Sequence, residues 1–481
     1  MRLKNPGILL AILAALIGGA CGRDEPRPRG VLLISIDSLR ADHLSSNGYK
    51  SPTAPQIPTS PSIDARLAAK GLVFERAVST TCWTLPAHMA LMTGQPDELH
   101  GVKSIHNALD VSHTTLASAM RKAGWRTAGF WSGINLHPTF GFDRGFERYV
   151  DCSGVEVPDE GVFQRTDSSA TEAITELQQL SHQGVTSPKL VAEFDTWFDS
   201  LGQGEAFFAF VHFWDVHFDY AAPPEDDVFD PDYRGALNGS NFFSILDKQE
   251  PRDLADFNRL LSLYDAEIRL TDRHVGMLLD RLEKAGRLDD TLVILVSDHG
   301  EEFYEHGRFG HYHSLYEEVV RIPMMIRWPA GFAPARTQEL ASLADVAPTI
   351  LDLCNVRRPE TMWGRSLAQV GKQALPPRLA PMEVTFAKPQ NFMRGVHAGD
   401  HKVVQHSRDE QATYFDLKAD PTEKNPLLEK DVPPEVVERI AAAEVAWEAL
   451  AKLALGMARS VNSQLPPQVK KKLDQSGYAG K

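Results

Sequence analysis

The sequence is poor in cysteine, in clustered positive charge and in long apolar segments. Its four cysteines include no CxxC pair, which excludes a disulfide-rich scaffold and a cysteine-rich zinc site. The formal net charge of -14 argues against a nucleic-acid-binding protein, because a phosphate backbone requires a basic face. The 481 residues contain no evident internal repeat. Their number fits two or three average domains, or one large α/β domain with an appendage.

The N-terminus is typical of an exported lipoprotein. An apolar run at 8–17 follows two basic residues and is too short to span a bilayer, as in a signal peptide. Small residues then lead to Cys21 in the manner of a bacterial lipobox, with Gly18 in place of the usual leucine. We expect a signal peptide at 1–21, lipidation of Cys21 and a flexible tether at 22–29, with ordinary cleavage nearby as the alternative. The protein is then exported to the cell envelope, periplasm or outer surface, and held there by a lipid anchor instead of a membrane span.

Apolar strand patterns alternate with amphipathic helices in the first three quarters of the chain. Buried-strand patterns occupy 30–37, 206–215 and 291–300, and a long amphipathic helix is expected at about 253–285. This alternation predicts a doubly wound α/β sheet. In such sheets, sites form at the C-terminal ends of the strands.

The pattern of predicted secondary structure changes beyond residue 375. Short strand patterns such as HKVVQH and ATYFDL replace the long apolar runs, and a helix is expected from 434 to 457. We therefore divide the mature chain into a large α/β domain at 30–375, a smaller α+β subdomain at 376–458 and a polar tail at 459–481.

Acids and imidazoles stand where three of the predicted strands end or shortly after. Asp37 ends the first strand, and Asp298 and His299 end a later one, where an acid beside an imidazole has no evident structural role. Residues of the same kinds crowd the stretches HFWDVHFDY and EHGRFGHYH. Carboxylate oxygens and imidazole nitrogens suit a borderline divalent ion such as zinc or manganese. For Asp37 taken alone, capping of the next helix is the alternative.

A series of motifs resembles the sulfatase family of the alkaline phosphatase superfamily. DSLRADHL, WTLPAHMALMTG, HFWDVHFDY, SDHGEEFYEHG and GHYHSLYEEVVRIPMMI occur in family order, and the resemblance covers roughly residues 30 to 430. It implies an alkaline phosphatase-like fold: a large mixed, mostly parallel sheet sandwiched by helices, with a smaller C-terminal domain. It also implies that an anionic ester binds at a metal ion and is attacked by a nucleophile of the enzyme.

The resemblance also locates the nucleophile. In sulfatases the nucleophile opens a motif of the form C/S-x-P-S-R, and a Thr-Gly pair follows a few residues later. Counting back from Pro86 and from the pair at 93–94 puts Thr84 at the nucleophile position, with His88 in place of the arginine. Cys82 lies two residues too early. The cysteine-to-formylglycine conversion of true sulfatases therefore has no proper substrate in this sequence.

A threonine in this position implies a particular metal site. Relatives such as phosphoethanolamine transferases and lipoteichoic acid synthases combine an acid, a threonine, an aspartate and a histidine. The matching residues here are Asp37, Thr84, Asp298 and His299. Many sulfatases carry a second acid after the first, and Ser38 in that position favours a single-metal set. We expect one divalent ion, with zinc or manganese favoured and calcium as a further candidate.

The resemblance implies roles for five further residues. His217 matches a histidine near the substrate oxyanion, and either His311 or His313 matches the residue that protonates the leaving oxygen. His88 and Lys103 are candidates to hold the oxygens of the anion. For each of them, capping or packing is the structural alternative.

We therefore predict a metal-dependent hydrolase of sulfate- or phosphate-type esters. Thr84, activated by the metal, attacks the ester, forms a covalent intermediate and is released by water. A phosphodiester or phosphonate ester is favoured. The alternatives are a sulfuric ester hydrolase in the strict sense, a phosphoryl-group transferase, and a non-catalytic envelope lipoprotein that binds an anionic ligand. The absence of several membrane spans before the domain favours a hydrolase over a transferase.

Overall fold

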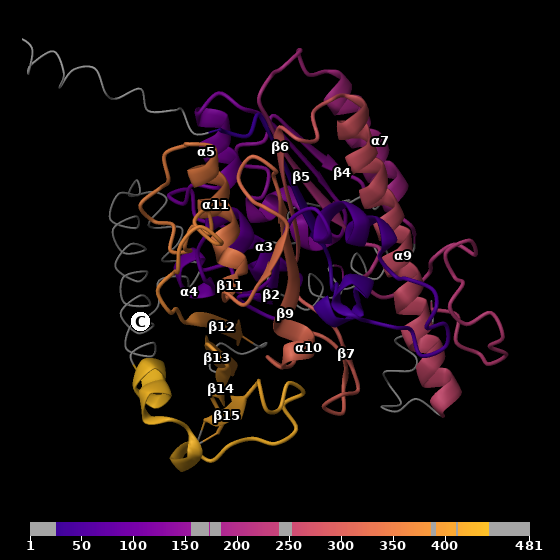
Figure 1. Cartoon of the computed structure of the whole chain (residues 1–481), viewed down its shortest axis with the longest axis vertical. Helices are drawn as coiled ribbons and strands as arrows, with labels where there is room; N and C mark the ends of the chain where they lie inside the picture. The colour runs from indigo at the N-terminus through magenta and orange to yellow at the C-terminus, as the bar shows by residue number, and fades with distance from the viewer. Residues whose placement is uncertain are drawn as a thin grey trace, which may run out of the picture.

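The structure, a computed structural model, describes residues 26–154, 173, 184–239, 253–385, 391–409 and 412–441. Its centre is a nine-stranded sheet with the order β10-β2-β9-β6-β1-β5-β3-β4, in which β11 also pairs with β2. Helices lie on both sides of this sheet (Figure 1). All pairings in it are parallel except those of β9, which runs antiparallel to β2 and β6. The doubly wound, mostly parallel sheet expected from the sequence is confirmed.

The three central strands match the predicted apolar runs. They are β1 (Gly30–Ile36), β5 (Phe207–Phe213) and β6 (Thr291–Ser297), and every residue in them is buried. Successive side chains of a strand point to opposite faces, so each strand contributes to two cores. The remaining strands of the sheet are β2 (Leu72–Val78), β3 (Arg126–Trp131), β4 (Arg148–Asp151), β9 (Arg321–Arg327), β10 (Ala335–Thr337) and β11 (Ala341–Ser342).

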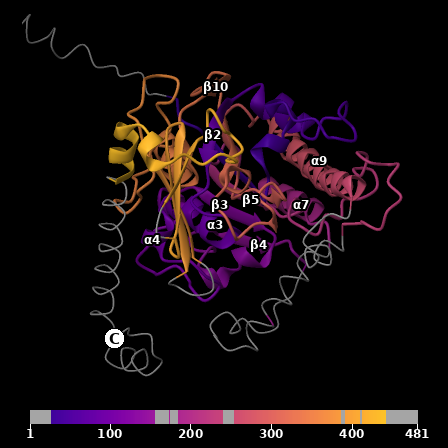
Figure 2. The ribbon, with the colours of Figure 1, turned by 90° about the horizontal axis from the view of Figure 1, so that it is seen from below.

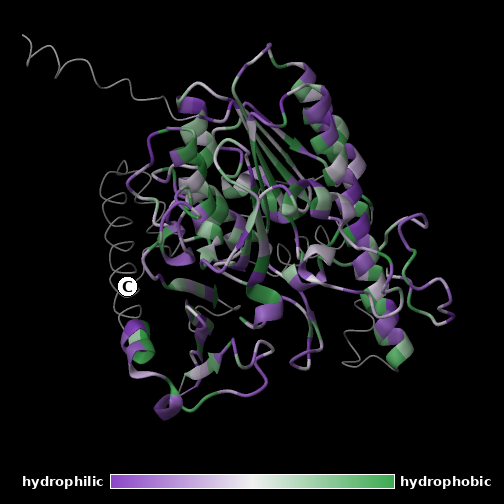
Figure 3. Cartoon of the chain, in the orientation of Figure 1, coloured by the Kyte–Doolittle hydropathy of each residue, from purple (hydrophilic) through white to green (hydrophobic). Residues whose placement is uncertain are grey.

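Two hydrophobic cores flank the sheet. Val31 and Leu33 of β1 pack into the core that also holds residues of α3 (Thr84–Thr93), α5 (Leu116–Lys122) and α11 (Val346–Leu353). Leu32 and Ile34 pack into the other core, with α7 (Ser187–Asp199) and α9 (Leu254–Lys284). Figure 3 shows the largely hydrophobic central strands, in green, between helices that are partly purple and so partly hydrophilic. Odd-numbered residues of β1 therefore face α3. The same alternation turns the odd-numbered residues at the end of this strand toward α3.

The predicted long helix at 253–285 is confirmed as α9. Its N-cap residue Asp253 accepts a hydrogen bond from the Asp256 amide at 2.9 Å, as an acidic cap does. The helix lies along one face of the sheet beside α7, on the side away from the C-terminal strands in both ribbon views (Figures 1 and 2). The shorter helices and strands of this part are α2 (Pro61–Ile63), α4 (Asp97–His100), α10 (Glu317–Val320), β7 (Glu302–Phe303) and β8 (Phe309–Gly310). No helix in the described ranges is both long and apolar enough to cross a bilayer.

A separate antiparallel sheet forms the C-terminal part, as expected. Its four strands follow one another in the order β12 (Ala380–Thr385), β13 (Phe392–Ala398), β14 (His401–His406) and β15 (Thr413–Asp416). Residues 434–441 are helical, and the rest of the helix predicted to 457 lies outside the described residues. The predicted signal peptide at 1–21, with Cys21, and the tail at 459–481 also lie outside them. The predicted domain boundary at 375/376 stays a prediction.

A buried lysine joins the C-terminal sheet to the large domain. Lys402 of β14 is fully buried, and its Nζ lies 3.0 Å from Glu317 of α10 and 2.9 Å from Glu423. The two carboxylates hold the pKa of Lys402 above its usual value despite its burial. Removing the cation leaves two buried carboxylates without compensation, which is the costly way to break a buried ion pair.

We expect Lys402→Met to destabilise the protein by about 3–5 kcal/mol, the range for breaking a buried ion pair. The measurement is the melting temperature, which should fall by several degrees. Lys430→Met, at an exposed residue of the same C-terminal part, is the matched control and should melt as the wild type does. An unchanged melting temperature in Lys402→Met would show that the lysine does not hold the two parts together.

Candidate active site

The register of the sheet brings two acids together. β1 and β6 run parallel with Ile36 opposite Ser297, so the next residues, Asp37 and Asp298, leave the sheet side by side. Both carboxylates are fully buried. The backbone amide of Asp37 donates to the carbonyl of Phe213 on β5 at 2.9 Å, which fixes the end of the strand.

Ser38 engages one oxygen of each acid. Its Oγ donates to Asp37 Oδ1 at 2.9 Å, and its backbone amide lies 3.2 Å from Asp298 Oδ1. Ser38 has a φ of 55°, in the left-handed region, where its amide and hydroxyl reach the two acids together. The second oxygens, Asp37 Oδ2 and Asp298 Oδ2, are buried and have no hydrogen-bond partner in the described part of the chain.

His299 adds a nitrogen to this pair of carboxylates. Its Nδ1 lies 2.8 Å from the carbonyl of Gly300, which can only accept, so the proton is on Nδ1 and Nε2 carries a lone pair. Nε2 lies 3.3 Å from Asp298 Oδ2 and 3.7 Å from Asp37 Oδ1. Burial raises the pKa of Asp37 to about 6, because desolvation of the charged carboxylate outweighs its stabilisation by His299 and the Ser38 hydroxyl.

Thr84 completes the group at the start of α3. Trp83 before it is extended, the helix begins at Thr84, and Gly94 ends it in the left-handed conformation. The Oγ1 of Thr84 lies 3.3 Å from His299 Nε2, and Thr84 is 1% exposed. No side chain caps this helix end. The first amides of α3 and the positive end of its dipole therefore lie beside Thr84, where a negative group is favoured.

The donor set fits a divalent cation. One ligand atom from each of Asp37, Asp298 and His299 lies within 4.8 Å of the other two, and all three residues are buried. Two unpaired carboxylate oxygens and an imidazole lone pair are the ligands that zinc and manganese accept. A second such group, formed by Glu302, His306 and Glu318, is engaged internally, since His306 pairs with Glu318 at 2.6 Å and its amide with Glu302 at 2.9 Å.

His88 lies beneath the site. Its Nδ1 donates to the carbonyl of Thr84 at 2.9 Å, and its Nε2 lies 2.9 Å from the hydroxyl of Ser35 on β1. Burial lowers the pKa of His88 to about 3, so the ring is neutral. These contacts fix the first turn of α3 on the sheet. Its predicted role in holding the anion stays a prediction.

His311 and His217 lie together on the other side of His299. The ring of His311 is centred 4.3 Å from that of His299 and 5.0 Å from that of His217. His217 stacks on Trp214 with a centroid distance of 4.1 Å, and its Nδ1 donates to the carbonyl of Phe218 at 2.7 Å. The structure thus brings these two predicted site residues to the proposed ligands.

His313 and Lys103 are held by other groups. Nε2 of His313 lies 2.8 Å from Glu302, and its Nδ1 lies 2.9 Å from the carbonyl of His311, so both nitrogens are engaged. Lys103 forms ion pairs with Glu98, at 3.2 Å, and with Glu383. These carboxylates raise the pKa of Lys103 above its usual value. The site roles predicted for His313 and Lys103 stay predictions.

Sequence reasoning assigned no role to two residues of this region. His212 of β5 lies beside Ser35 in the sheet register, and its Nε2 is 3.4 Å from Asp37 Oδ2. Glu301 lies 3.0 Å from His311 Nδ1. The sequence does carry a signal for His212, since it is a histidine in the otherwise apolar strand FFAFVHF. Glu301 follows the DHG motif directly.

Cys82 is separated from this chemistry by its burial. Its side chain belongs to the hydrophobic core on the α3 side of the sheet and has no exposed surface. Burial raises the pKa of the Cys82 thiol to about 12, which keeps it protonated and unreactive. Cys82, Cys152 and Cys354 are all buried free thiols.

The sheet topology and the acids and imidazoles at its strand ends define an enzyme of the alkaline phosphatase superfamily. The Sulfatase family model matches residues 29–356, and the model described as N-sulphoglucosamine sulphohydrolase, C-terminal, matches residues 304–446. The chain therefore belongs to the sulfatase family. It is a hydrolase acting on ester bonds, as sulfatases and phosphonate monoester hydrolases are.

Similar proteins include both sulfatases and a phosphonate monoester hydrolase. An N-acetylglucosamine-6-O-sulfatase of Bacteroides thetaiotaomicron is 24% identical, with 89% of this chain and 88% of the relative covered. A protein solved with its substrate D-glucosamine-2-N,6-O-disulfate has a TM-score of 0.71 at 18% identity, covering 89% of this chain and 98% of the other. The phosphonate monoester hydrolase of Agrobacterium radiobacter has a TM-score of 0.67 at 21% identity, covering 88% of this chain and 96% of the other. These structural similarities show the shared alkaline phosphatase-like fold.

Adding Zn²⁺ or Mn²⁺ to chelator-treated protein should raise its melting temperature, because the ion would bind the buried Asp37 and Asp298 oxygens that accept no hydrogen bond from any described residue. Binding only to the folded state stabilises by about 2.7 kcal/mol at a free ion concentration of one hundred times Kd. In Asp298→Asn most of this increment should be lost, since the variant removes the charge of a proposed ligand.

Asp272→Asn is the matched control for this experiment. Asp272 is a buried carboxylate that accepts the amides of Ser62 and Ile63 and takes no part in the site. Its variant should be less stable and still gain the full increment from the ion. A full increment in Asp298→Asn would contradict the metal assignment.

Proposed function

We propose that this protein hydrolyses phosphodiesters or phosphonate esters, with Thr84 as the nucleophile. The observation that carries the proposal is the place of the Thr84 hydroxyl, 3.3 Å from His299 Nε2 at the buried start of α3. The two unpaired carboxylate oxygens of Asp37 and Asp298 belong to the same cluster. The neighbouring candidates are engaged elsewhere, since Cys82 packs in the hydrophobic core and the Thr93 hydroxyl donates to the carbonyl of Met89 at 2.7 Å.

A threonine nucleophile favours phosphorus over sulfur as the element attacked. The sulfatase mechanism needs a formylglycine made from a cysteine or serine at the nucleophile position, and this chain has Thr84 there. A threonine hydroxyl attacks once a base or a metal ion lowers its pKa. A bound divalent ion, of which zinc or manganese suits these ligands best, supplies that activation and the charge that stabilises the developing anion.

The neighbouring residues supply binding and proton transfer. The uncapped amides at the start of α3 favour the negative ester group beside Thr84. His88 holds this first turn through the Thr84 carbonyl. His217 stacks on Trp214 and lies edge-on to His311, and these contacts support a role for it in binding an ester oxygen.

His311 is the better candidate for the general acid. Burial raises the pKa of Glu301 to about 8 and lowers that of His311 to about 4, so at neutral pH Glu301 carries the proton. A protonated Glu301 donates to His311 Nδ1 over 3.0 Å, so the ring carries its own proton on Nε2. When the Nε2 proton passes to a leaving oxygen, Glu301 transfers its proton to Nδ1, so the imidazole stays neutral and Glu301 becomes a carboxylate. His313 has both nitrogens engaged by Glu302 and a backbone carbonyl.

Hydrolysis of sulfuric esters is the second candidate function. The family match and the relative named N-acetylglucosamine-6-O-sulfatase favour it. In this case the same Thr84 attacks sulfur without formylglycine. Export and anchoring through Cys21 belong to the proposal as well, because a lipid anchor would place the enzyme at the envelope, where it meets extracellular esters.

Turnover of an aryl phosphodiester and an aryl sulfate, measured side by side on metal-loaded protein, tests the proposal. We expect the phosphodiester to be the better substrate and Thr84→Ala to lower its kcat/KM by about a thousandfold or more, as loss of a nucleophile does. Thr84→Ser keeps the hydroxyl and should retain measurable activity.

Cys82→Ala is the matched control two residues away. It removes the thiol and leaves the proposed nucleophile in place, so its kcat should stay close to that of the wild type. Dominant aryl sulfatase activity that survives in Thr84→Ala, or disappears in Cys82→Ala while the fold persists, would overturn the mechanism.

A further inference from the structure

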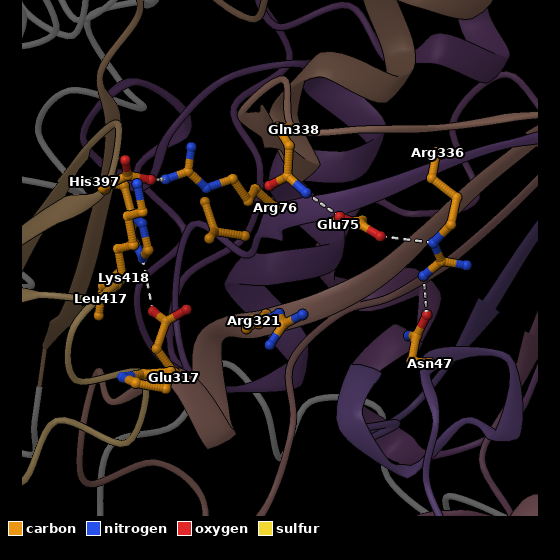
Figure 4. Close-up of a pocket in the computed structure, with 13 residues that line it drawn as sticks. Asn47, Glu75, Arg76, Glu317, Arg321, Arg336, Gln338, His397, Leu417 and Lys418 are labelled. Carbon is orange, nitrogen blue, oxygen red and sulfur yellow. Dashed lines mark hydrogen bonds and ion pairs between the residues drawn. The ribbon is translucent and has the colours of Figure 1, made fainter.

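A hollow of about 370 Å³ lies where the large sheet meets the C-terminal sheet. β2 and the start of β9 form one wall, and the turn after β13 together with residues 417–421 forms the other. Figure 4 shows its lining, which is mostly charged. Two acids and two imidazoles of the candidate active site, at residues 37, 298, 299 and 311, are not among the residues that line it.

Every carboxylate in this lining already has a cationic partner. Glu75 accepts from Arg336 at 2.7 Å, and Asp400 forms an ion pair with Arg76. Glu317 pairs with the buried Lys402 at 3.0 Å, and it also contacts His397 at 2.8 Å. Burial lowers the pKa of His397, so this imidazole is neutral at pH 7.

Two cations remain without such a partner. Among the described residues, the guanidinium of Arg321 and the ammonium of Lys418 have no hydrogen-bonding or ion-pairing group. In Figure 4 no dashed line reaches Arg321, whereas dashed lines join Glu75, Arg336 and Asn47. The positive charge of Arg321 contributes to the lowered pKa of Asp42, but the Asp42 carboxylate forms its ion pair with Arg40, at 2.7 Å.

The charges in the hollow therefore leave a positive excess. Burial lowers the pKa of the Arg76 guanidinium, and the like charge of Arg321 acts in the same direction. The chain as a whole carries a net charge of -14, so this local positive excess runs against its overall charge. A half-buried guanidinium offers several N–H groups in a planar fork, the geometry that binds sulfate and phosphate oxygens in pairs.

We propose that this hollow is a second oxyanion site, in which Arg321 binds a sulfate or phosphate group and Lys418 adds a further positive charge. The group is either a free anion or one anionic group of a long substrate. The inference goes beyond the proposed function and does not depend on which ester the active site cleaves. Sulfate and phosphate oxygens share the donors that this site offers.

Calorimetric titration of the metal-loaded protein with sodium sulfate, at constant ionic strength, tests the site. In the wild type we expect a binding event that weakens about tenfold or more in Arg321→Gln, because a charge-assisted contact worth at least about 1.4 kcal/mol is lost. Arg321→Lys should restore part of the affinity. Arg408→Gln, at an exposed arginine outside the hollow, is the matched control and should bind sulfate as the wild type does.

A kinetic measurement separates this site from the active site. The competitive inhibition constant of sulfate against a small aryl ester reports the active site and should be unchanged in Arg321→Gln. Lys418→Gln should also weaken the sulfate binding measured by calorimetry. Because Lys418 is exposed, this variant should fold and can test the site even if Arg321→Gln does not fold. Equal sulfate affinity in the wild type, Arg321→Gln and Lys418→Gln would overturn the proposal, even where Thr84 proves to be the nucleophile.

Kinetics with a long and a short substrate distinguish the two sources of the anion. A group on a long substrate predicts that KM for a multiply sulfated or phosphorylated oligosaccharide ester rises in Arg321→Gln with kcat unchanged. KM for the small aryl ester then stays as in the wild type. A free anion predicts that neither KM changes although the calorimetric event is weakened.

Discussion

The burial of two adjacent carboxylates is the constraint on which the rest of the site depends. Asp37 and Asp298 leave adjacent parallel strands side by side, and neither has exposed surface. Burial removes the charged carboxylate of Asp37 from water and opposes its ionisation, as its raised pKa shows. Ser38 satisfies one oxygen of each acid and leaves the other oxygens for a cation. The folded protein therefore holds a group of residues that could bind a divalent ion, whose two positive charges would balance the two carboxylates.

The sheet and its two cores hold this site rigidly. Alternation along β1 turns its odd-numbered residues toward α3, so that Ser35 meets His88 and Asp37 belongs to the group around Thr84. His88 in turn holds the Thr84 carbonyl, so the first turn of α3 is fixed to the same strand that supplies the acid. The proposed nucleophile on a packed helix and the proposed ligands at strand ends are placed more precisely than groups on loops would be.

Much of the candidate site could be predicted because it follows from local sequence. Apolar runs located β1 and β6, and strand ends in such sheets locate Asp37, Asp298 and His299. Thr84 required a motif register, which the family resemblance provided. Glu383, which pairs with Lys103, could not be foreseen, because 280 positions separate the two residues and no periodicity records such a pairing. The same holds for His212 beside Asp37 and for the hollow around Arg321, which elements distant in sequence assemble.

The central claim is that the Thr84 hydroxyl forms the covalent intermediate. The most direct measurement is peptide mass spectrometry of enzyme that is quenched with acid during turnover of a phosphodiester. The account predicts a peptide that carries the transferred group on Thr84, next to an unmodified Cys82. Formylglycine at residue 82, or a labelled residue other than Thr84, would contradict it.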